Sequence, residues 1–399
     1  MKYCLGVDVA AIDSMFCLVA ENGEVVFLPE KQPHTFTGFN NITKKFNDIC
    51  ESDITVIMES TSTYHLKVER FFRENTSCKV IVINPIISSN HKRNLRKTKT
   101  DKEDCLNLVD IYFKSEYNMQ AEHDYIYLEL QFISRQIQHL QEGATRTRNR
   151  LKQFISMINP IYYSVFTNDY MYSENGLQFM ARWPHCDMIK NATVDELTAS
   201  FAEIAKRSPN YYRKKADALK AASIDCFPAT DVNSVMCKCL SDSALYLLSQ
   251  QREIESLKNQ LIYLASTTDL FKLYITITGI GPYLASVLVA ELKDIRRFDN
   301  HKKLIAYCGL DPTIVQSGKT INYNGPISKR GNTTARKMIF YSVNVILTVA
   351  RKVDPEMPLL LYYKKKRDEG KHHHASIVAC CTKLLRILLA MSKQNTPYR

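Results

Sequence analysis

A long apolar seam is the feature that most limits how this chain can fold. From Ile126 to Ile158 the apolar residues step by four and three positions, and only Thr147 interrupts them. This spacing is the period of helices in a coiled coil. A second seam with the same period runs from Leu247 to Leu264. The two seams indicate an antiparallel helical hairpin or a dimer seam, and two packed helices of a bundle fit the pattern equally well.

These seams divide the chain into three parts. We expect an N-terminal domain over residues 1–120, a coiled-coil region with a helical insertion over 121–268, and a mainly α C-terminal domain over 269–399. Within the insertion, residues 194–206 and 211–222 have helical patterns, but no motif there indicates a function. With 399 residues and 45% hydrophobic content, the chain is long enough for two or three compact units.

The first hundred residues alternate between strand and helix signals. Strands are predicted at 3–10, 15–20, 25–28, 54–59 and 79–83, and helices at 36–50 and 64–75. The pair Asn22-Gly23 predicts a type I′ hairpin between the second and third strands. Three early strands followed by helix, strand, helix and strand predict a mixed sheet covered by helices. That order suits an RNase H-like α/β fold, although such a sheet does not by itself decide function.

The charge of the chain favours a polyanionic partner. The net charge is +12, and lysines and arginines that neutralise phosphates release condensed counterions. A more local signal follows Asp311, where seven Lys or Arg residues occur before the next acid, Asp354. The Gly279-Ile280-Gly281 turn could likewise approach a phosphate, and an ordinary helix connection explains it as well.

Neither export nor structural zinc is expected. The first ten residues lack the basic region, long apolar region and cleavage site of a signal peptide, and no uninterrupted apolar stretch is long enough to span a membrane. We therefore expect a cytosolic protein with no membrane partner. The 12 cysteines form no CxxC pair and should be reduced thiols. Cys237 with Cys239, Cys380 with Cys381, and the run from His372 to His374 lack the spacing of a structural zinc site.

Four carboxylates are expected to converge. Asp8 lies inside an apolar strand and Glu59 ends a second one, which the usual sheet order places beside the first. Asp101 and Asp104 begin a helix on the stripe that also carries Cys105, and that stripe should pack on the sheet. Four acids on one side cannot all stay ionised without a cation.

Such a cluster suits two-metal phosphoryl transfer, in which oxygen ligands hold Mg²⁺ ions around the attacking and leaving oxygens. Taken one at a time, the acids have simpler explanations, since an Asp that begins a helix is usually an N-cap and a Glu that ends a strand is often solvated. The neighbouring segment is strongly basic and is predicted to bind nucleic acid through Lys92, Arg93, Arg96, Lys97 and Lys99.

Several short motifs, in order, resemble a known family. They are Gly6-Val7-Asp8-Val9, Met58-Glu59-Ser60-Thr61, Asn84-Pro85, the run from Lys99 to Asp104, Gly309-Leu310-Asp311-Pro312, Ser317-Gly318, and the run from Ile327 to Asn332. The chain is similar in these motifs to the DEDD transposases of the insertion-sequence one-ten family. The likeness covers both ends of the chain and leaves the middle uncovered.

The resemblance implies a RuvC-like N-terminal domain with Asp8, Glu59, Asp101 and Asp104 as its metal-binding quartet. It also implies a coiled-coil connection and a C-terminal transposase domain with Ser317 as the covalent nucleophile. Members of this family recombine DNA under the guidance of a structured bridge RNA. The implied partners are therefore donor and target DNA, that RNA, and further copies of the chain in a homodimer or homotetramer. The expected cofactor is Mg²⁺, with two ions bound.

Ser317 needs activation from outside its own motif. A serine hydroxyl is a poor nucleophile without a base or a metal, and cations must stabilise the charge of the transition state. Basic residues near it in sequence are expected to contact phosphates, namely Lys319, Lys329, Arg330 and Arg336. Asp311 and Ser328 are interpreted as a turn acid and a helix N-cap. Without the family resemblance, Ser317 would be interpreted as a turn residue before Gly318.

Two other functions fit the same sequence. The first is a metal-dependent RuvC-like nuclease or junction resolvase, in which the four acids hydrolyse DNA and Ser317 is structural. The second is a nucleic-acid scaffold without catalysis, which binds through the basic C-terminal domain. A covalent protein–DNA adduct is expected only of the transposase, and metal-dependent hydrolysis without an adduct only of the nuclease.

Overall fold

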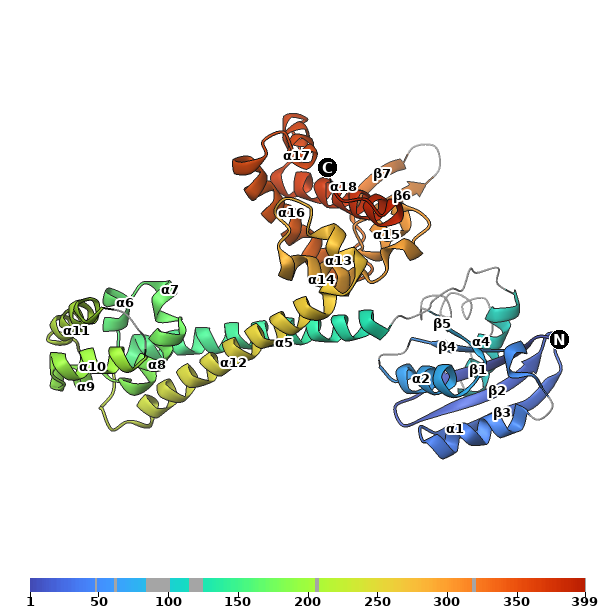
Figure 1. The fold of residues 1–399 in the computed structure, drawn as a ribbon, viewed down its shortest axis with the longest axis horizontal. Helices are drawn as coiled ribbons and strands as arrows, with labels where there is room; N and C mark the ends of the chain where they lie inside the picture. Colours follow the sequence, from blue (N-terminus) through green and yellow to red (C-terminus); the bar gives the residue numbers. More distant parts are fainter. Residues whose placement is uncertain are drawn as a thin grey trace. The chain divides into compact units, whose positions relative to one another are not determined.

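The chain divides into two compact units, Met1–His123 and Asp124–Arg399 (Figure 1). The computed structural model describes residues 1–46, 49–60, 63–83, 101–114, 125–204, 208–317 and 321–398, with the backbone alone for Asp101, 314–317 and 321–324. The boundary predicted at residue 120 lies close to this division, and the boundary predicted at 268 lies within the second unit. The organisation into three domains stays a prediction.

The first unit is built on a five-stranded mixed sheet with the order β3-β2-β1-β4-β5. Its strands are β1 (Tyr3–Val9), β2 (Asp13–Ala20), β3 (Val25–Pro33), β4 (Ile54–Glu59) and β5 (Lys79–Ile83). The first three strands pair antiparallel, whereas β1, β4 and β5 run parallel to one another. This arrangement confirms the mixed sheet predicted from the sequence.

The two faces of the sheet pack against different helices. On one face, Leu5 and Val56 join a core with α1 (Phe36–Thr43) and α2 (His65–Asn75). On the other face, Cys4 and Ile57 form a second core with α4 (Asp101–Lys114). Because successive side chains of a strand point to opposite faces, every second residue of β1 and β4 faces α4.

The β2–β3 hairpin is present, but its turn differs from the predicted type I′. That type needs a positive φ at both central residues, and here Gly23 has φ 85° whereas Asn22 does not have a positive φ. The Gly23 amide donates to the Ala20 carbonyl at 2.9 Å, and the Ala20 amide donates to the Glu24 carbonyl at 2.8 Å. The loop therefore holds three residues, a type I turn followed by a left-handed glycine.

One helix and one strand of this unit also differ in length from the prediction. The helix expected over 36–50 ends at Thr43 and continues as a 3₁₀ turn, Lys44–Phe46, and a second 3₁₀ turn spans Glu51–Asp53. β3 extends to Pro33, five residues beyond its predicted end. The strands at 54–59 and 79–83 have the predicted bounds.

Two long helices, α5 (Tyr125–Ile158) and α12 (Val235–Ser266), run alongside each other through the second unit (Figure 1). They contain the two apolar seams, so the seams belong to helices that pack within one chain. The two ends of the pair join different cores. Leu130 and Leu261 belong to the core of the C-terminal helices, whereas Leu151 and Leu240 belong to the core of the insertion.

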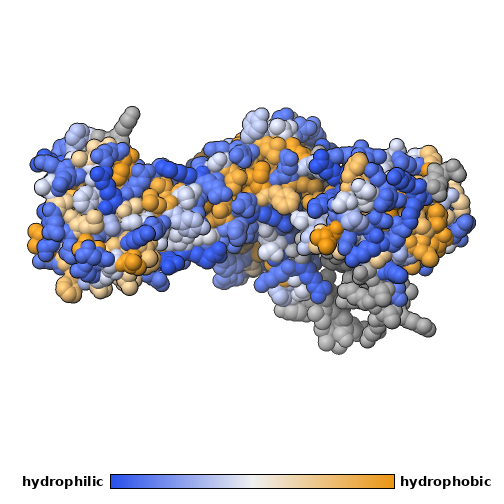
Figure 2. All heavy atoms as spheres, turned by 90° about the horizontal axis from the view of Figure 1, so that it is seen from below, coloured by the Kyte–Doolittle hydropathy of each residue, from blue (hydrophilic) through white to orange (hydrophobic). Residues whose placement is uncertain are grey.

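The insertion between these helices is itself helical. It consists of α6 (Ile161–Val165), α7 (Asn168–Met171), α8 (Glu174–Arg182), α9 (Cys186–Asn191), α10 (Val194–Ile204) and α11 (Pro209–Ser223). Its core includes the stacked rings of Phe179 and Phe201, whose centroids are 3.9 Å apart. On the face seen in Figure 2, hydrophilic residues cover much of the insertion at the left of the view, with apolar patches between them. The helical patches predicted near 194 and 211 are confirmed as α10 and α11.

The C-terminal part of the second unit surrounds a larger core. Its helices are α13 (Asp269–Tyr274), α14 (Pro282–Leu292), α15 (His301–Tyr307), α16 (Thr333–Val353), α17 (Pro358–Asp368) and α18 (His373–Gln394), with a 3₁₀ turn at Ile295–Arg297. A two-stranded antiparallel hairpin of β6 (Pro312–Ser317) and β7 (Ile321–Ile327) projects from these helices. The sequence did not predict this hairpin.

Helix α18 is the one helix among the described residues that is long and apolar enough to cross a membrane. Its most apolar window is 56% buried within the unit, and Leu384, Leu385 and Leu388 lie in the core with α16. The apolar character of α18 is therefore accounted for by packing between helices.

Candidate active site

Asp8 and Glu59 lie on the same face of the sheet, at the same end of neighbouring parallel strands. In β1, Cys4 faces α4, and Asp8 is four residues further along, on the same face. In β4, Ile57 faces α4, and Glu59 follows two residues later. The strands are paired up to Val7 opposite Met58, so the next pair in this register is Asp8 with Glu59. Both side chains are half-buried.

Helix α4 packs unusually close to β1 at this point. A Cβ placed on Gly6 would lie 2.5 Å from the carbonyl oxygen of Cys105, so only a residue without a side chain fits. The Cys105 thiol donates to the Gly6 carbonyl at 3.0 Å and contacts the Cys17 sulfur at 3.1 Å. Burial raises the pKa of the Cys105 thiol well above its usual value, and the neighbouring Cys17 raises it further.

The predicted stripe of α4 does face the sheet. Cys105 and Leu108 are buried in the core on this side, and the Tyr112 hydroxyl is 3.0 Å from the hydroxyl of Thr55 on β4. Asp104, next to Cys105, is half-buried. The backbone of Asp101 begins the helix, and its side chain lies outside what the structure describes. The two strands and the helix that carry the predicted acids therefore meet at one face, and the site assigned to these acids stays a prediction.

The donors of this face suit a hard divalent cation, because they are carboxylate oxygens on rigid elements. Among the described residues, however, three ligand atoms lie within 4.8 Å of one another only at His185, Cys186 and Asp187. Asp8, Glu59 and Asp104 thus share a face without forming so tight a cluster. Asp8 and Glu59 lie on the face of the sheet that α4 covers, Asp104 lies on α4, and their role as metal ligands stays a prediction.

The cluster at His185 is explained by helix capping. The Nδ1 atom of His185 accepts a hydrogen bond from the Asp187 amide at 3.1 Å, as the N-cap of α9. Its Nε2 atom is 2.9 Å from the Thr230 carbonyl, so this nitrogen carries the proton. Both ring nitrogens are therefore engaged. Burial raises the pKa of the neighbouring Cys186 thiol to about 12, which disfavours the thiolate that a metal would need.

In the second unit, two of the sequence motifs lie side by side. The amides of Ser328 and Lys329 donate to the carbonyls of Asp311 and Gly309 at 2.8 and 3.1 Å. The Ser328 hydroxyl donates to the Asp311 carboxylate at 2.7 Å. Arg336 donates to the Cys308 carbonyl at 3.0 Å. The motif from Gly309 to Pro312 and the motif from Ile327 to Asn332 therefore form one structure at the base of the β6–β7 hairpin.

This arrangement corrects one sequence interpretation and agrees with another. Ser328 is not the N-cap of the following helix, because α16 begins five residues later and the Asn332 side chain accepts from the Ala335 amide. Ser328 instead closes the turn through Asp311. Asp311 is a turn acid, as predicted.

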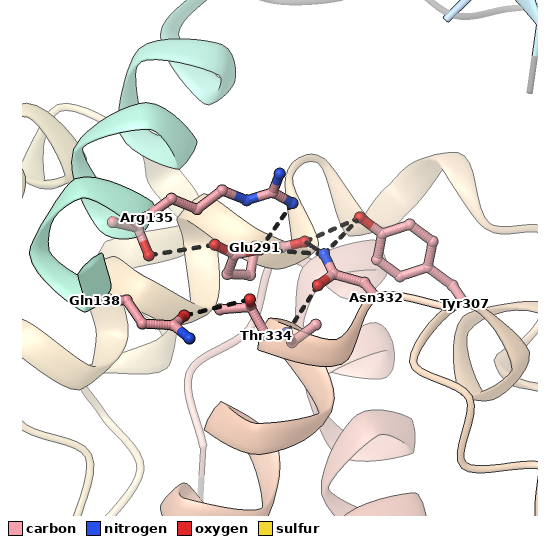
Figure 3. A network of polar contacts seen from close by, with 8 residues as sticks. Arg135, Gln138, Glu291, Tyr307, Asn332 and Thr334 are labelled. Carbon is pink, nitrogen blue, oxygen red and sulfur yellow. Dashed lines mark hydrogen bonds and ion pairs between the residues drawn. The ribbon is translucent and has the colours of Figure 1, made fainter. Parts of the chain in front are cut away.

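A buried glutamate fixes the position of Asn332 (Figure 3). Glu291, in α14, is fully buried and accepts from the Asn332 side chain at 3.1 Å and from the Ser134 hydroxyl at 3.3 Å. Arg135 lies 3.7 Å from the same carboxylate, and the Tyr307 hydroxyl donates to the Glu291 carbonyl at 3.1 Å. The sequence interpretation missed this residue. A single acid near the end of the apolar run from Tyr283 to Leu292 was the signal that could have revealed it.

The predicted nucleophile and phosphate contacts have different positions in this unit. Ser317 is the last residue of β6, and its backbone pairs with Ile321 of β7. Lys329 and Arg330 are exposed beside the start of α16, whereas Arg336 is half-buried by its contact with Cys308. Lys319 and the basic residues Lys92, Arg93, Arg96, Lys97 and Lys99 lie outside the described residues.

Two regions of the chain match family models of transposases. Residues 5–160 match a family model of DEDD transposases of IS110 elements, described as Transposase. Residues 272–358 match a model described as Transposase IS116/IS110/IS902 family. Two regions of the chain are thus similar to transposase domains of IS110-type elements. The mixed sheet of the first unit is consistent with the RNase H-like N-terminus of such a protein.

A short region of the chain is also similar in sequence to a curated protein. The chain is 42% identical over 62 residues to a protein of Sinorhizobium fredii named "Putative transposase y4rJ". The alignment covers 16% of this chain and 15% of that protein. The resemblance inferred from the sequence motifs is confirmed at the level of two IS110-type transposase domains.

Proposed function

We propose that this chain is the transposase of an insertion sequence and acts as a site-specific DNA recombinase that cuts and rejoins DNA by phosphoryl transfer. The observation that carries the proposal is the position of Asp8 and Glu59 at one end of β1 and β4, under the helix that begins with Asp101 and bears Asp104. This arrangement is compatible with a carboxylate quartet, and the matches to transposase domains support the proposal.

In this proposal, Asp8, Glu59, Asp101 and Asp104 hold divalent metal, which we expect to be two Mg²⁺ ions. When bound, such ions polarise a phosphoryl oxygen and activate an oxygen nucleophile. The contribution of the chain is rigid placement of the carboxylates. Asp8 is fixed by its pairing with Met15 of β2 and Glu59 by its pairing with Ile83 of β5, and α4 is held against β1 by the contact between Gly6 and Cys105.

Ser317 is the proposed covalent nucleophile. Its hydroxyl oxygen would form an ester with the scissile phosphorus, and the bond from that phosphorus to the departing strand would break, with the leaving oxygen taking up a proton. Attack by the hydroxyl of another strand would reverse these changes and release the serine. Lys329 and Arg330 are exposed near the base of the β6–β7 hairpin, where they can contact phosphates, whereas Ser317 ends β6 at the turn end of the hairpin.

The proposed partners follow from this function. They are donor and target DNA and a structured guide RNA, which would select the DNA by base pairing. Because the quartet and Ser317 belong to different units, a homodimer or homotetramer could assemble a site from two chains. We propose that the protein works in the cytoplasm, at the nucleoid.

The central experiment recovers the flanking noncoding end of the element, transcribes it, and measures recombination of matching plasmids with purified protein in Mg²⁺. Asp8→Ala, Glu59→Ala, Asp101→Ala and Asp104→Ala should each abolish recombination with little loss of stability, because each removes a like charge from the cluster. Glu24→Ala changes an exposed acid of the same unit and serves as the control. Wild-type activity in three of the four quartet variants would refute the metal site.

The second measurement concerns the covalent step. A trapped reaction run on a denaturing gel should show a DNA–protein band with wild type and none with Ser317→Ala, although this variant should still bind nucleic acid. A band that persists with Ser317→Ala would eliminate Ser317 as the nucleophile. Metal-dependent cleavage without any band would instead identify the chain as a RuvC-like nuclease or junction resolvase.

A further inference from the structure

The C-terminal end of the chain is its most basic part, and no role is assigned to it by the family match, which ends at residue 358. From Tyr362 onward there are nine Lys or Arg residues and two acids. The excess of seven positive charges is more than half of the net charge of +12. Helices α17 and α18, which pack against each other, carry most of these residues.

A groove of about 330 Å³ lies on this surface. It is lined by Tyr362 of α17 and by Thr382, Lys383, Arg386, Ile387 and Ala390 of α18. The α18 residues follow one another at helical spacing, so they form a single stripe that extends over roughly 10 Å. The stripe combines an apolar floor, Ile387 and Ala390, with two cationic side chains.

An aromatic ring forms one side of this groove. The Lys383 ammonium lies 4.5 Å from the centroid of the Tyr362 ring, and that of Lys366 lies 5.3 Å from it. Lys366 is already paired with Glu369. Among the described residues, Lys383 and Arg386 form no ion pair with a carboxylate, so both are available to an anionic ligand.

We propose that this α17–α18 groove binds unpaired nucleotides of a nucleic-acid strand. The Tyr362 ring would stack on a base, whose flat faces also suit the apolar floor, while Lys383 and Arg386 would contact the adjoining phosphates. Exposed Lys364, Lys365 and Arg367 continue the positive charge along α17, beyond the groove. That continuation favours an extended polyanion over a compact anion or a short acidic peptide.

The inference rests on the proposed function, because it adds a second nucleic-acid contact to the one at Lys329 and Arg330. The test uses the full chain and fluorescence anisotropy with labelled oligo(dT), oligo(U) and a duplex of the same length. The key variants are Lys383→Ala with Arg386→Ala, Tyr362→Leu, and Tyr362→Phe, which keeps the ring. The control is Lys272→Ala with Lys303→Ala, which removes two exposed lysines of the same unit that are each paired with an acid.

The double cationic variant should bind both single strands at least tenfold more weakly. Its slope of log affinity against log salt should be smaller by about 1.4, which corresponds to two single-strand phosphate contacts. Tyr362→Leu should lose roughly tenfold for single strands and little for the duplex, whereas Tyr362→Phe should bind like wild type. Equal losses of affinity for oligo(dT) and oligo(U) show that the groove binds bases and phosphates common to DNA and RNA. A loss for only one of them assigns the groove to that type of nucleic acid.

Unchanged single-strand affinity in folded variants would overturn the inference, and so would a loss no larger than that of the control. A loss of binding to an acidic peptide with full retention of the oligonucleotides would also overturn it. Thermal melts of every variant verify folding, and Tyr362→Phe separates the loss of stacking from the loss of packing. If wild type recombines DNA while these variants bind normally, only this inference fails. If wild type neither binds nucleic acid nor recombines, the proposed function fails.

Discussion

Substituting Gly6 by alanine should disable the candidate active site without touching any carboxylate. The new Cβ would lie 2.5 Å from the Cys105 carbonyl oxygen and 2.8 Å from a methyl group of Val109. Ordinary contact begins near 3.4 Å, so the first turns of α4 must retreat by about 0.9 Å at Cys105. This helix begins at Asp101 and bears Asp104. Their displacement from Asp8 and Glu59 is the expected cause of the lost activity.

Two magnitudes follow from that displacement. Overpacking of a core typically costs about 1–3 kcal/mol, and this should lower the melting temperature of the first unit by about 4 °C for each kcal/mol. A misplacement of about 1 Å in a reacting constellation can cost roughly 100-fold in rate, so recombination should fall by about two orders of magnitude.

The assays are calorimetric unfolding and plasmid recombination in Mg²⁺. Gly23→Asn is the control, because Gly23 lies in a turn with φ 85° and open space around it, and asparagine tolerates this backbone conformation. It should retain wild-type stability to within about 1 kcal/mol and full activity. If Gly6→Ala matched the control in both assays, α4 would not be held in register by this contact, and the placement of the quartet would have to be reconsidered.

Three further predictions concern the second unit. Glu291→Ala should lower the free energy of unfolding by about 2–4 kcal/mol, because Ser134 and Asn332 lose a buried acceptor. Urea unfolding measures this loss, with Glu255→Ala, which changes an exposed acid, as the control. A loss equal to that of the control would contradict the prediction. Lys329→Ala or Arg330→Ala should reduce the slope of log affinity for duplex DNA against log salt concentration by about 0.9 for each lost phosphate contact. A slope unchanged in both variants would show that this segment does not contact the DNA. Burial raises the pKa of the Cys308 thiol from 9.0 to about 12, so its contribution to stability is complete below pH 9 and is lost as the pH rises toward 12. In denaturant unfolding, the gap in stability between wild type and Cys308→Ala should be constant below pH 9 and should shrink as the pH rises from 9 toward 12. A gap that stays constant across that range would refute the assignment.

The sheet of the first unit was predictable because its buried strands appear in the sequence as short apolar runs. Ile54–Glu59 and Lys79–Ile83 are short apolar runs bounded by polar residues, and both formed strands with the predicted bounds. The ends of α1 and the turn at Gly23 were not predictable to the same degree. Both depend on how neighbouring elements meet, and local propensity contains little of that information.

The β6–β7 hairpin shows why the C-terminal part was harder to predict. Its strands include Pro312, Gly325 and Pro326, residues that ordinarily argue against a strand. The hairpin is two-stranded, so it has edges where proline costs no ladder hydrogen bond. Pairing between its two strands keeps the segment extended at its base, where the Thr313 hydroxyl donates to the Pro326 carbonyl at 2.8 Å.

The motif from Ser328 to Asn332 contains residues with two separate tasks, and only the structure distinguishes them. Gly331 has φ 127°, and a Cβ there would lie 2.4 Å from the Tyr307 carbonyl, so this position is fixed by backbone geometry. Asn332 is engaged twice, with the amide of Ala335 at the start of α16 and with buried Glu291. Lys329 and Arg330, by contrast, are exposed. Because the contacts of Gly331 and Asn332 with the core determine the conformation of the loop, the side chains of Lys329 and Arg330 can stay exposed to solvent. Substitutions at Gly331 or Asn332 should therefore impair folding of the loop first, whereas those at Lys329 and Arg330 should impair nucleic-acid affinity alone.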